Sequence, residues 1–349
     1  MSVIAIIGAG MMGTALAWPL TDNGHTVRLI GTPFDKEIIA SIHKNGSHPR
    51  LNRHVPAGVT AFEATQLSTA LEGVDFIANG VSSFGVGWFA EVVGPHLKPG
   101  VPVIAVTKGL EDQPDGDLLI LPEAISRRLP VTLQGKISLN AIGGPCIAHE
   151  LAARRQTGVV FCGKDEAVLS ILKSIFGTSY YHIWTSTHLI GVEVCAALKN
   201  AYAMGVGLAV GMMEAAGPDG LAAMYNPQAA LFAQSCLEMR RMLTVLGGDP
   251  DEVSWLPGAG DLFVTVFGGR TVRLGKMLGQ GISFEEARRR MAGETLESVE
   301  IITRVARALP RLESRGRARQ ADYPLLLHMN EMINEGKMVK LPWESFFIA

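Results

Sequence analysis

A lysine stands inside one of the most apolar stretches of the chain. The stretch VCAALKNAYAMGVGLAVGMM begins at Val194, and Lys199 is its one charged side chain. Burying an unpaired ammonium group is costly, so such a lysine is either paired or used in chemistry. A lysine held in apolar surroundings can act as a general acid or base. Lys199 is therefore a candidate general acid.

Three glycines near the N-terminus predict a dinucleotide site. Gly8, Gly10 and Gly13 form the pattern GxGxxG within VIAIIGAGMMGTALA, directly after a β-type run and at the start of a helix-like segment. In this context the first glycine allows a tight turn, the second lets the backbone approach a pyrophosphate, and the third allows close packing of helix on strand. Met11 and Met12 lie in the same turn and are expected to line the site.

The end of the second expected strand bears on the choice between NAD and NADP. An NAD site usually has an acid there, which binds the ribose hydroxyls. In LIGTPFD the acid is replaced by Gly31 and Thr32, and Asp35 comes late for that role. Without the acid a 2′-phosphate is not repelled, and Thr32 could donate a hydrogen bond to it. This favours acceptance of NADP, although no arginine stands at the strand end.

The chain changes character near residue 187. Before it, short apolar runs alternate with helical segments, which predicts a mostly parallel sheet covered on both faces. After it, longer runs have helical spacing, at 188–213, 227–247, 283–291 and 295–309. We therefore predict an α/β Rossmann domain over residues 1–187 and an all-α domain over 188–349. Residues 13–24 suggest one helix disturbed by Pro19, and Ser283 with Glu286 fits a capping box.

Composition excludes several classes of function. The net charge is −2, so a nucleic-acid partner is not implied. The four cysteines form no CxxC pair, the nine histidines form no metal-ligand cluster, and no G-x-S-x-G elbow is present, so we expect no metal and no serine hydrolase. Reduced cysteines fit the cytoplasm best. We expect no membrane insertion, because Lys199 and Asn200 interrupt the apolar stretch. The arginine-rich patch 310–319 is expected to be a solvated helix end or loop.

Further polar residues could complete a site around Lys199. Lys108 follows an apolar run, where α/β sheets place ligand contacts. Asp261 and Thr265 are four residues apart and would share one helix face, from which Asp261 could orient Lys199. Arg270 offers a planar fork for phosphate oxygens.

These segments together resemble the NAD(P)-dependent glycerol-3-phosphate dehydrogenase family, and part of the chain is similar to its archaeal members. The matching segments cover most of the chain in order: GAGMMGTALA (8–17), TKGL (107–110), GGPCIAHELA (143–152), GVEVCAALKNAYA (191–203), GAGDLFVT (258–265), GGR (268–270) and MLGQG (277–281). The resemblance implies a Rossmann domain followed by a helical domain. It also implies reversible reduction of dihydroxyacetone phosphate with NAD or NADP, a step of glycerophospholipid metabolism.

The resemblance also implies roles for individual residues. Lys199 matches the catalytic lysine and Lys108 the second active-site lysine. The other substrate-side positions are Gly144, Asn200, Asp261, Thr265, Arg270 and Thr271, of which Thr271 departs from the family pattern. The cofactor-side matches are Ala148 and Glu297, together with Lys108 and Arg270, besides the glycine-rich turn and Thr32.

Two departures from the family pattern leave alternatives open. Thr271 replaces an asparagine that helps to hold the substrate phosphate, and Cys146 replaces a threonine or serine. A related enzyme on the same fold could reduce another phosphorylated or sulfonated ketone. A non-catalytic dinucleotide sensor is the third reading, but a sensor would not need Lys199, Asp261 and Arg270. The apolar helices are equally consistent with a homodimer and with a monomer.

Overall fold

The computed structural model describes residues 1–217 and 225–348, and its contacts divide the chain into two compact units. The first unit consists of Met1–Lys108 and Leu121–Leu189, and the second of Gly109–Ile120 and Ile190–Ala349. The chain therefore crosses between the units after Lys108, after Ile120 and after Leu189. The domain boundary predicted between residues 187 and 188 stays a prediction.

The first unit is built on an eight-stranded sheet, in the order β12-β11-β10-β7-β6-β1-β2-β5. All neighbouring strands are parallel except β10 and β11, which are antiparallel. The strands are β1 (Val3–Ile7), β2 (Thr26–Ile30), β5 (Val59–Phe62), β6 (Phe76–Asn79), β7 (Val103–Ala105), β10 (Leu139–Gly143), β11 (Thr157–Cys162) and β12 (Tyr181–Ser186). The predicted α/β class, Rossmann-like with a helical part following, is confirmed.

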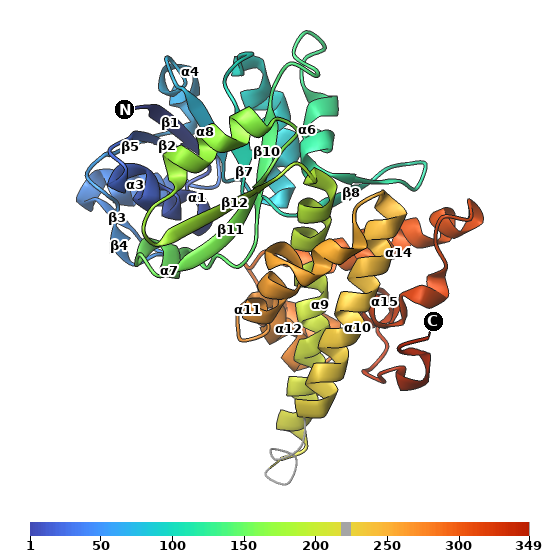
Figure 1. The fold of residues 1–349 in the computed structure, drawn as a ribbon. Helices are drawn as coiled ribbons and strands as arrows, with labels where there is room; N and C mark the ends of the chain where they lie inside the picture. The colour runs from blue at the N-terminus through green and yellow to red at the C-terminus, as the bar shows by residue number, and fades with distance from the viewer. Residues whose placement is uncertain (218–224, 349) are drawn as a thin grey trace. The chain divides into compact units, whose positions relative to one another are not determined.

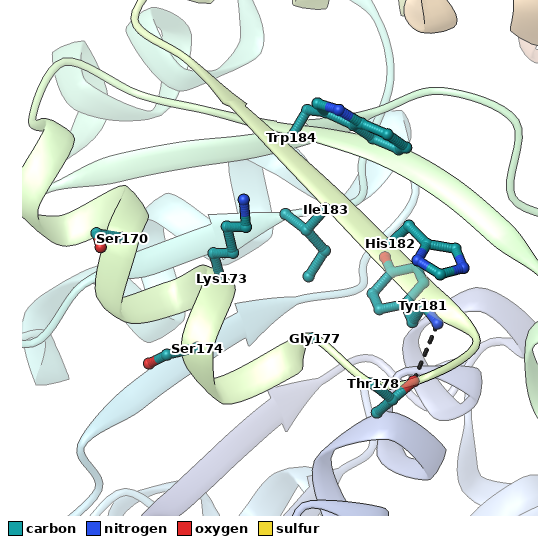
Figure 2. A pocket seen from close by; sticks show the side chains of 9 residues that line it. All are labelled: Ser170, Lys173, Ser174, Gly177, Thr178, Tyr181, His182, Ile183 and Trp184. Carbon is teal, nitrogen blue, oxygen red and sulfur yellow. Dashed lines mark hydrogen bonds between the residues drawn. The ribbon is translucent and has the colours of Figure 1, made fainter.

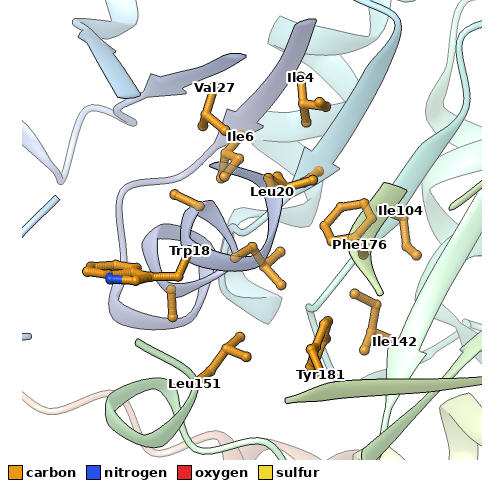
Figure 3. Packing of buried hydrophobic residues seen from close by; sticks show 14 of the residues in the cluster. Ile4, Ile6, Trp18, Leu20, Val27, Ile104, Ile142, Leu151, Phe176 and Tyr181 are labelled. Atoms are coloured by element: carbon orange, nitrogen blue, oxygen red, sulfur yellow. The ribbon is translucent and has the colours of Figure 1, made fainter. Parts of the chain in front are cut away.

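Helices and a short β-ribbon complete the first unit. The ribbon pairs β3 (Ser47–His48) with β4 (Arg53–His54). The helices are α1 (Met11–Ala15), α2 (Ala17–Asp22), α3 (Lys36–Asn45), α4 (Leu67–Ala70), α5 (Val86–Trp88), α6 (Leu121–Arg128), α7 (Ala148–Ala152) and α8 (Glu166–Phe176). Strand residues such as Ile4 and Ile6 pack with Leu20 and Phe176 from the helices in one continuous core (Figure 3). Burial of these side chains is the main force that fixes the sheet on its helices.

The segment after β1 forms two short helices instead of the one expected. Helix α1 ends at Ala15 and α2 begins at Ala17, with Leu16 between them. Pro19 has no N–H to donate to the carbonyl of Ala15, and its ring crowds that carbonyl, so the helix breaks one turn before the proline. The predicted capping box is half-formed. Ser283 accepts from the N–H of Glu286 at 3.3 Å, but the Glu286 carboxylate pairs with Arg289 and Arg290.

The strand order creates a switch point beside β1. Strand β1 lies between β2 on one side and β6 on the other, so successive connections leave it in opposite directions. In open α/β sheets, ligands bind at the carboxyl ends of the strands next to such a point. Gly8 follows β1 and Gly80 follows β6, so the glycine-rich turn lies at this place in the sheet.

The second unit is helical, with one added hairpin. Its helices are α9 (Leu189–Ala215), α10 (Tyr225–Leu246), α11 (Asp261–Thr265), α12 (Arg270–Gly279), α13 (Phe284–Arg290), α14 (Glu297–Ser314) and α15 (Pro324–Asn334). Helices α9 and α10 run side by side, and Tyr202 on α9 donates to Glu238 on α10 at 3.0 Å (Figure 1). Among the described residues α9 alone is long and apolar enough to span a membrane, but 89% of its most apolar window is buried inside the protein. Helix α9 is therefore a core helix.

The hairpin of the second unit comes from the first half of the sequence. It pairs β8 (Leu110–Asp112) with β9 (Leu118–Ile120), directly after Lys108. Arginines of α14 hold it along one helix face: Arg304 donates to the carbonyl of Leu110 at 2.7 Å, and Arg307 to Asp112 at 2.9 Å. The arginine-rich patch expected to be solvated also contributes, because Arg315 and Arg317 bind Asp117.

Candidate active site

The glycine-rich turn of the first unit is closed by backbone contacts. Gly8 has a φ of +98°, and a Cβ there would lie 2.8 Å from the carbonyl carbon of Gly80. A Cβ on Gly13 would lie 2.4 Å from the carbonyl oxygen of Gly8. Gly10 differs, because nothing lies within 4 Å of its Cβ position. Gly8 and Gly13 are thus required by packing, whereas Gly10 leaves open space beside the backbone, as a bound pyrophosphate requires.

Gly80, which follows β6, packs against this turn, and the sequence analysis did not predict it. Its own Cβ position lies 2.8 Å from the Cα of Gly13, and its N–H donates to the carbonyl of Ile7 at 2.7 Å. The sequence signal was present, because Gly80 directly follows a short apolar run. However, only the strand order shows that this run lies next to the glycine-rich turn.

The first unit also contains Met11, Met12 and Ala148, predicted on the cofactor side, and Gly144, predicted on the substrate side. Met11 is exposed and Met12 is half-buried at the start of α1. Ala148 is the first residue of α7, and α7 packs against α1. Gly144 follows β10 with a φ of +121°, a conformation that favours glycine. The first unit therefore brings Ala148 to the helix that carries the glycine-rich turn.

The structure changes the interpretation of the end of β2. The hydroxyl of Thr32 donates to Asp35 Oδ2 at 2.7 Å, and the N–H of Thr32 donates to the same oxygen at 2.8 Å. The sequence analysis expected the Thr32 hydroxyl to donate a hydrogen bond to a 2′-phosphate. In the structure this hydroxyl donates to Asp35 instead. Asp35 is buried.

Lys199, Asp261 and Thr265 meet in the second unit. Lys199 Nζ donates to Asp261 Oδ1 at 2.9 Å and to Thr265 Oγ1 at 2.9 Å. Lys199 is 8% exposed and Asp261 2% exposed, so the ion pair is largely withdrawn from water. As predicted from their spacing, Asp261 and Thr265 lie on one face of α11 and point to the same ammonium group. Pairing with a buried carboxylate offsets the cost of burying Lys199.

Arg270, predicted to bind phosphate, and Glu297, predicted on the cofactor side, lie at the N-terminal ends of two helices in the second unit. Arg270 opens α12 and forms an ion pair with Glu297, which opens α14, at 3.3 Å between Nη2 and Oε2. The Arg270 side chain is 41% exposed, so a ligand can reach it. Thr271 is buried beside it, and Asn200 is half-buried on α9. Lys108 belongs to the first unit, where it follows β7 and is half-buried.

The described residues fit a dinucleotide cofactor. The open space at Gly10, between positions that admit no side chain, is a cradle in which backbone can approach a pyrophosphate. No group of three or more histidine, cysteine, aspartate or glutamate residues in the described part of the chain could hold a metal ion.

An open pocket of about 610 Å³ lies elsewhere on the first unit, between α8 and β12 (Figure 2). Lys173 reaches it from α8, and His182, Ile183 and Trp184 from β12. None of the predicted site residues lines this pocket, so it has no part in the chemistry considered above.

Comparison with known proteins agrees with this arrangement. Residues 3–169 match the N-terminal family model, and residues 188–343 the C-terminal family model, of NAD-dependent glycerol-3-phosphate dehydrogenase. The NADP(+)-dependent glycerol-3-phosphate dehydrogenase of Archaeoglobus fulgidus is 38% identical over 82% of each chain. The glycerol-3-phosphate dehydrogenase [NAD(P)+] of Bacillus velezensis is 30% identical, over 99% of this chain and 94% of its own.

Solved structures give the same result. The crystal structure of glycerol-3-phosphate dehydrogenase from Coxiella burnetii has a TM-score of 0.81 and 26% identity, and the match covers 99% of this chain and 97% of that one. Two family models that together span most of the chain, and a relative 38% identical over 82% of it, show that the chain belongs to the NAD-dependent glycerol-3-phosphate dehydrogenase family, NAD(P)-dependent oxidoreductases that act on a CH–OH group.

Proposed function

We propose that the chain catalyses reversible reduction of dihydroxyacetone phosphate to glycerol 3-phosphate, with Lys199 as the proton donor and acceptor. The observation that carries this assignment is the buried cluster of Lys199, Asp261 and Thr265, with both contacts to the lysine at 2.9 Å. A lysine is costly to bury in a helical core even when it is paired. A general acid for a ketone oxygen does require one, held in a fixed position.

The two partners of Lys199 favour its charged form. The Asp261 carboxylate accepts from the ammonium group and carries the opposite charge. The Thr265 hydroxyl donates its own proton to the carbonyl of Asp261 at 2.6 Å, so a lone pair on its oxygen faces Lys199. An ammonium group held in this way is a fixed positive charge, which can stabilise the developing alkoxide and then protonate it. In the reverse direction the neutral amine accepts the alcohol proton.

The remaining roles follow from position and charge. Bound NAD(P)H supplies the hydride when it occupies the glycine-rich turn. The backbone at Gly10 would approach its pyrophosphate, Gly8 and Gly13 give the turn its shape, and Ala148 lies on the helix that packs against α1. Arg270 binds the substrate phosphate as a planar fork and releases part of its contact with Glu297 to do so. Binding energy from the phosphate, which does not react, then holds the carbonyl group in place.

We assign Lys108, Gly144, Asn200 and Thr271 to the substrate side as well. Thr271 is buried next to Arg270 and has a hydroxyl where the family pattern has an amide. Lys108 adds positive charge, which suits an anionic substrate.

Substrate choice and residue roles can be tested separately. Oxidation of NADPH and of NADH is followed with dihydroxyacetone phosphate and with unphosphorylated dihydroxyacetone. We expect turnover with the phosphate ester and little without it. Arg270→Ala should lower kcat/KM for the ester, through kcat as well as KM, because the phosphate contact that it removes also holds the carbonyl group in place. No turnover of the ester with either cofactor, in a protein that binds the cofactor, would refute the assignment.

We further propose a cytoplasmic enzyme of glycerophospholipid metabolism that works without metal ions, nucleic acid or membrane insertion. No disulfide joins the four cysteines, all of which lie in the described part of the chain, and this suits a reducing compartment. A homodimer is consistent with the exposed Phe263 and Phe267, whose rings pack edge to face 4.9 Å apart. Light scattering of the purified protein distinguishes a dimer from a monomer.

A further inference from the structure

Ala9, between the first two glycines of the turn, has both of its backbone polar groups held by side chains. Its N–H donates to Asp35 Oδ2 at 3.1 Å, and its carbonyl accepts from His48 Nε2 at 2.9 Å. Ala9 is fully buried. The orientation of this residue fixes the direction in which the next peptide, that of Gly10, faces the open space. The two side chains therefore hold the part of the turn that would approach a pyrophosphate.

Asp35 is turned into the protein instead of toward a ligand. It lies at the N-cap position of α3, but its side chain does not cap that helix. Its Oδ2 accepts three hydrogen bonds, from Ala9 N–H and from the N–H and hydroxyl of Thr32. Thr32 in turn accepts from Phe34 N–H at 3.3 Å. The carboxylate thus ties the loop after β2 to the loop after β1.

His48, on β3, holds Ala9 from its other side. We call Asp35 and His48, the two side chains that bind the backbone of Ala9, the clamp. His48 Nδ1 accepts from the N–H of Leu51 at 3.0 Å, so the proton of the neutral ring is on Nε2, which donates to the carbonyl of Ala9. The ring is fully buried, and burial lowers the pKa of His48, which keeps it in this neutral form. The tautomer is therefore set by the same contacts that hold the turn.

We propose that Asp35 and His48 are positioning residues that lock the glycine-rich turn in its cofactor-binding form, and that Asp35 does not bind the ribose. This proposal rests on the proposed cofactor site. A turn ordered before binding loses less entropy when the cofactor binds, so the clamp raises the affinity for both cofactors. A ribose-binding acid would instead favour NADH and repel the 2′-phosphate of NADPH.

The ratio of the two cofactor affinities separates these roles. We measure the Kd of NADPH and of NADH by fluorescence for the wild type, Asp35→Ala and Asp35→Asn. Asp35→Ala should weaken both cofactors by roughly tenfold and by the same factor, as expected for the loss of hydrogen bonds to a charged group. Asp35→Asn retains an acceptor oxygen and should leave the ratio unchanged. The proposal would be overturned if either variant lost affinity for NADH while its affinity for NADPH stayed the same or increased.

A matched control separates the clamp from general stability. Asp75 Oδ2 accepts from the N–H of Val3 at 2.8 Å, so it makes the same kind of contact at the opposite end of β1. Asp75→Ala should leave both cofactor affinities unchanged. An equal loss in Asp75→Ala and Asp35→Ala would show that Asp35 acts through stability alone and would also overturn the proposal.

A second measurement needs no cofactor. Amide hydrogen exchange of residues 8–14 in the free protein should be faster in Asp35→Ala and His48→Ala than in the wild type, and unchanged in Asp75→Ala. Unchanged exchange in both clamp variants would contradict the proposal. If instead the wild type binds neither cofactor, the proposed function fails, whereas the exchange result still judges the clamp.

Discussion

The glycine-rich turn and the lysine cluster are built on opposite principles. The turn depends on atoms that are missing: a Cβ at Gly13 would lie 2.4 Å from the oxygen of Gly8. The cluster depends on atoms that are present: Lys199, Asp261 and Thr265 each supply a functional group at hydrogen-bond distance. We therefore expect the turn to fail when a group is added and the cluster to fail when one is removed.

The difference also divides the expected effects between binding and chemistry. Changes in the turn should affect cofactor affinity, because its backbone is the part that would contact a pyrophosphate. Changes in the cluster should affect turnover and leave cofactor affinity alone. The two regions would not be separate in function if a substitution in the cluster changed cofactor affinity, or if one in the turn changed turnover at saturating cofactor.

Within the glycine-rich turn, the largest effect is expected from Gly13→Ala. The added methyl group meets backbone, which cannot move aside cheaply, so we expect a loss of stability of about 1–3 kcal/mol. The displaced turn should also weaken NADPH and NADH by more than about a hundredfold, a tenfold change being 1.4 kcal/mol. Calorimetry and fluorescence titration measure the two effects.

Gly10→Ala is the matched control for this substitution. Its methyl group meets no protein atom, so stability should change by less than about 0.5 kcal/mol while cofactor affinity still falls. Equal loss of stability in the two variants would contradict the account of the turn.

Asp261→Asn should have the next largest effect. The amide can still accept from Lys199 but carries no charge, so we expect kcat to fall by about 10–100-fold, as for the loss of a charge-assisted hydrogen bond. Thr265→Val should act in the same direction but less, and Thr265→Ser should retain most of the activity. Steady-state kinetics with both cofactors test the order. A change confined to the KM of the cofactor would speak against this role of Asp261.

The second unit holds another buried carboxylate, Glu238, which differs from Asp261 in having neutral hydrogen-bond donors as partners. Glu238 accepts from neutral donors: the Tyr202 hydroxyl, the Gln234 amide and the N–H groups of Leu325 and Leu326. Burial raises the pKa of Glu238 to about 7, against 4.5 for an exposed glutamate. The folded state therefore binds a proton that the unfolded chain has released between these values.

Glu238 should therefore make the protein less stable as the pH rises through this range. The stability linked to Glu238 is fully present below about pH 4.5 and is lost as the pH rises to about 7, by about 3 kcal/mol in total. Glu238→Gln should lack this slope. The free energy of unfolding is measured with denaturant at several pH values for the wild type and for Glu238→Gln. Their difference gives the contribution of Glu238, because the histidines titrate in both proteins. A difference that does not change with pH would show that Glu238 is already ionised when buried.

The smallest effect is expected at the hairpin that follows Lys108. Arg304 is 20% exposed and holds a backbone carbonyl, whereas Arg307 is 60% exposed and pairs with a carboxylate alone. Arg307→Ala should change stability by less than about 1 kcal/mol, as for a surface ion pair. Arg304→Ala should cost more and speed amide exchange in residues 109–120. The reverse order would show that the carbonyl contact does not hold the hairpin.

The sequence predicts the local features and misses those that need distant segments. The turn at Gly8 is readable because a strand, three glycines and a helix follow one another. The break at Leu16 was also readable, since Pro19 cannot bond the carbonyl four residues earlier. Gly80 and the inward-turned Asp35 were not readable, because each depends on which strands become neighbours.

The lysine cluster could be anticipated only in part. The spacing of Asp261 and Thr265 places them on one helix face, but neither spacing nor periodicity brings residues 62 positions apart together. Resemblance to a family supplied that pairing. The hairpin at residues 109–120 was missed for the same reason, since its binding partners are arginines of α14 nearly two hundred residues later.

One measurement tests the division of roles most directly: turnover and cofactor affinity of Lys199→Ala in the same preparation. We expect kcat with dihydroxyacetone phosphate to fall by about 10²–10⁴, the usual contribution of a general acid, while the Kd of NADPH stays within about twofold of the wild type. Activity that remains within about tenfold of the wild type would contradict the account, because the proton would then come from another group.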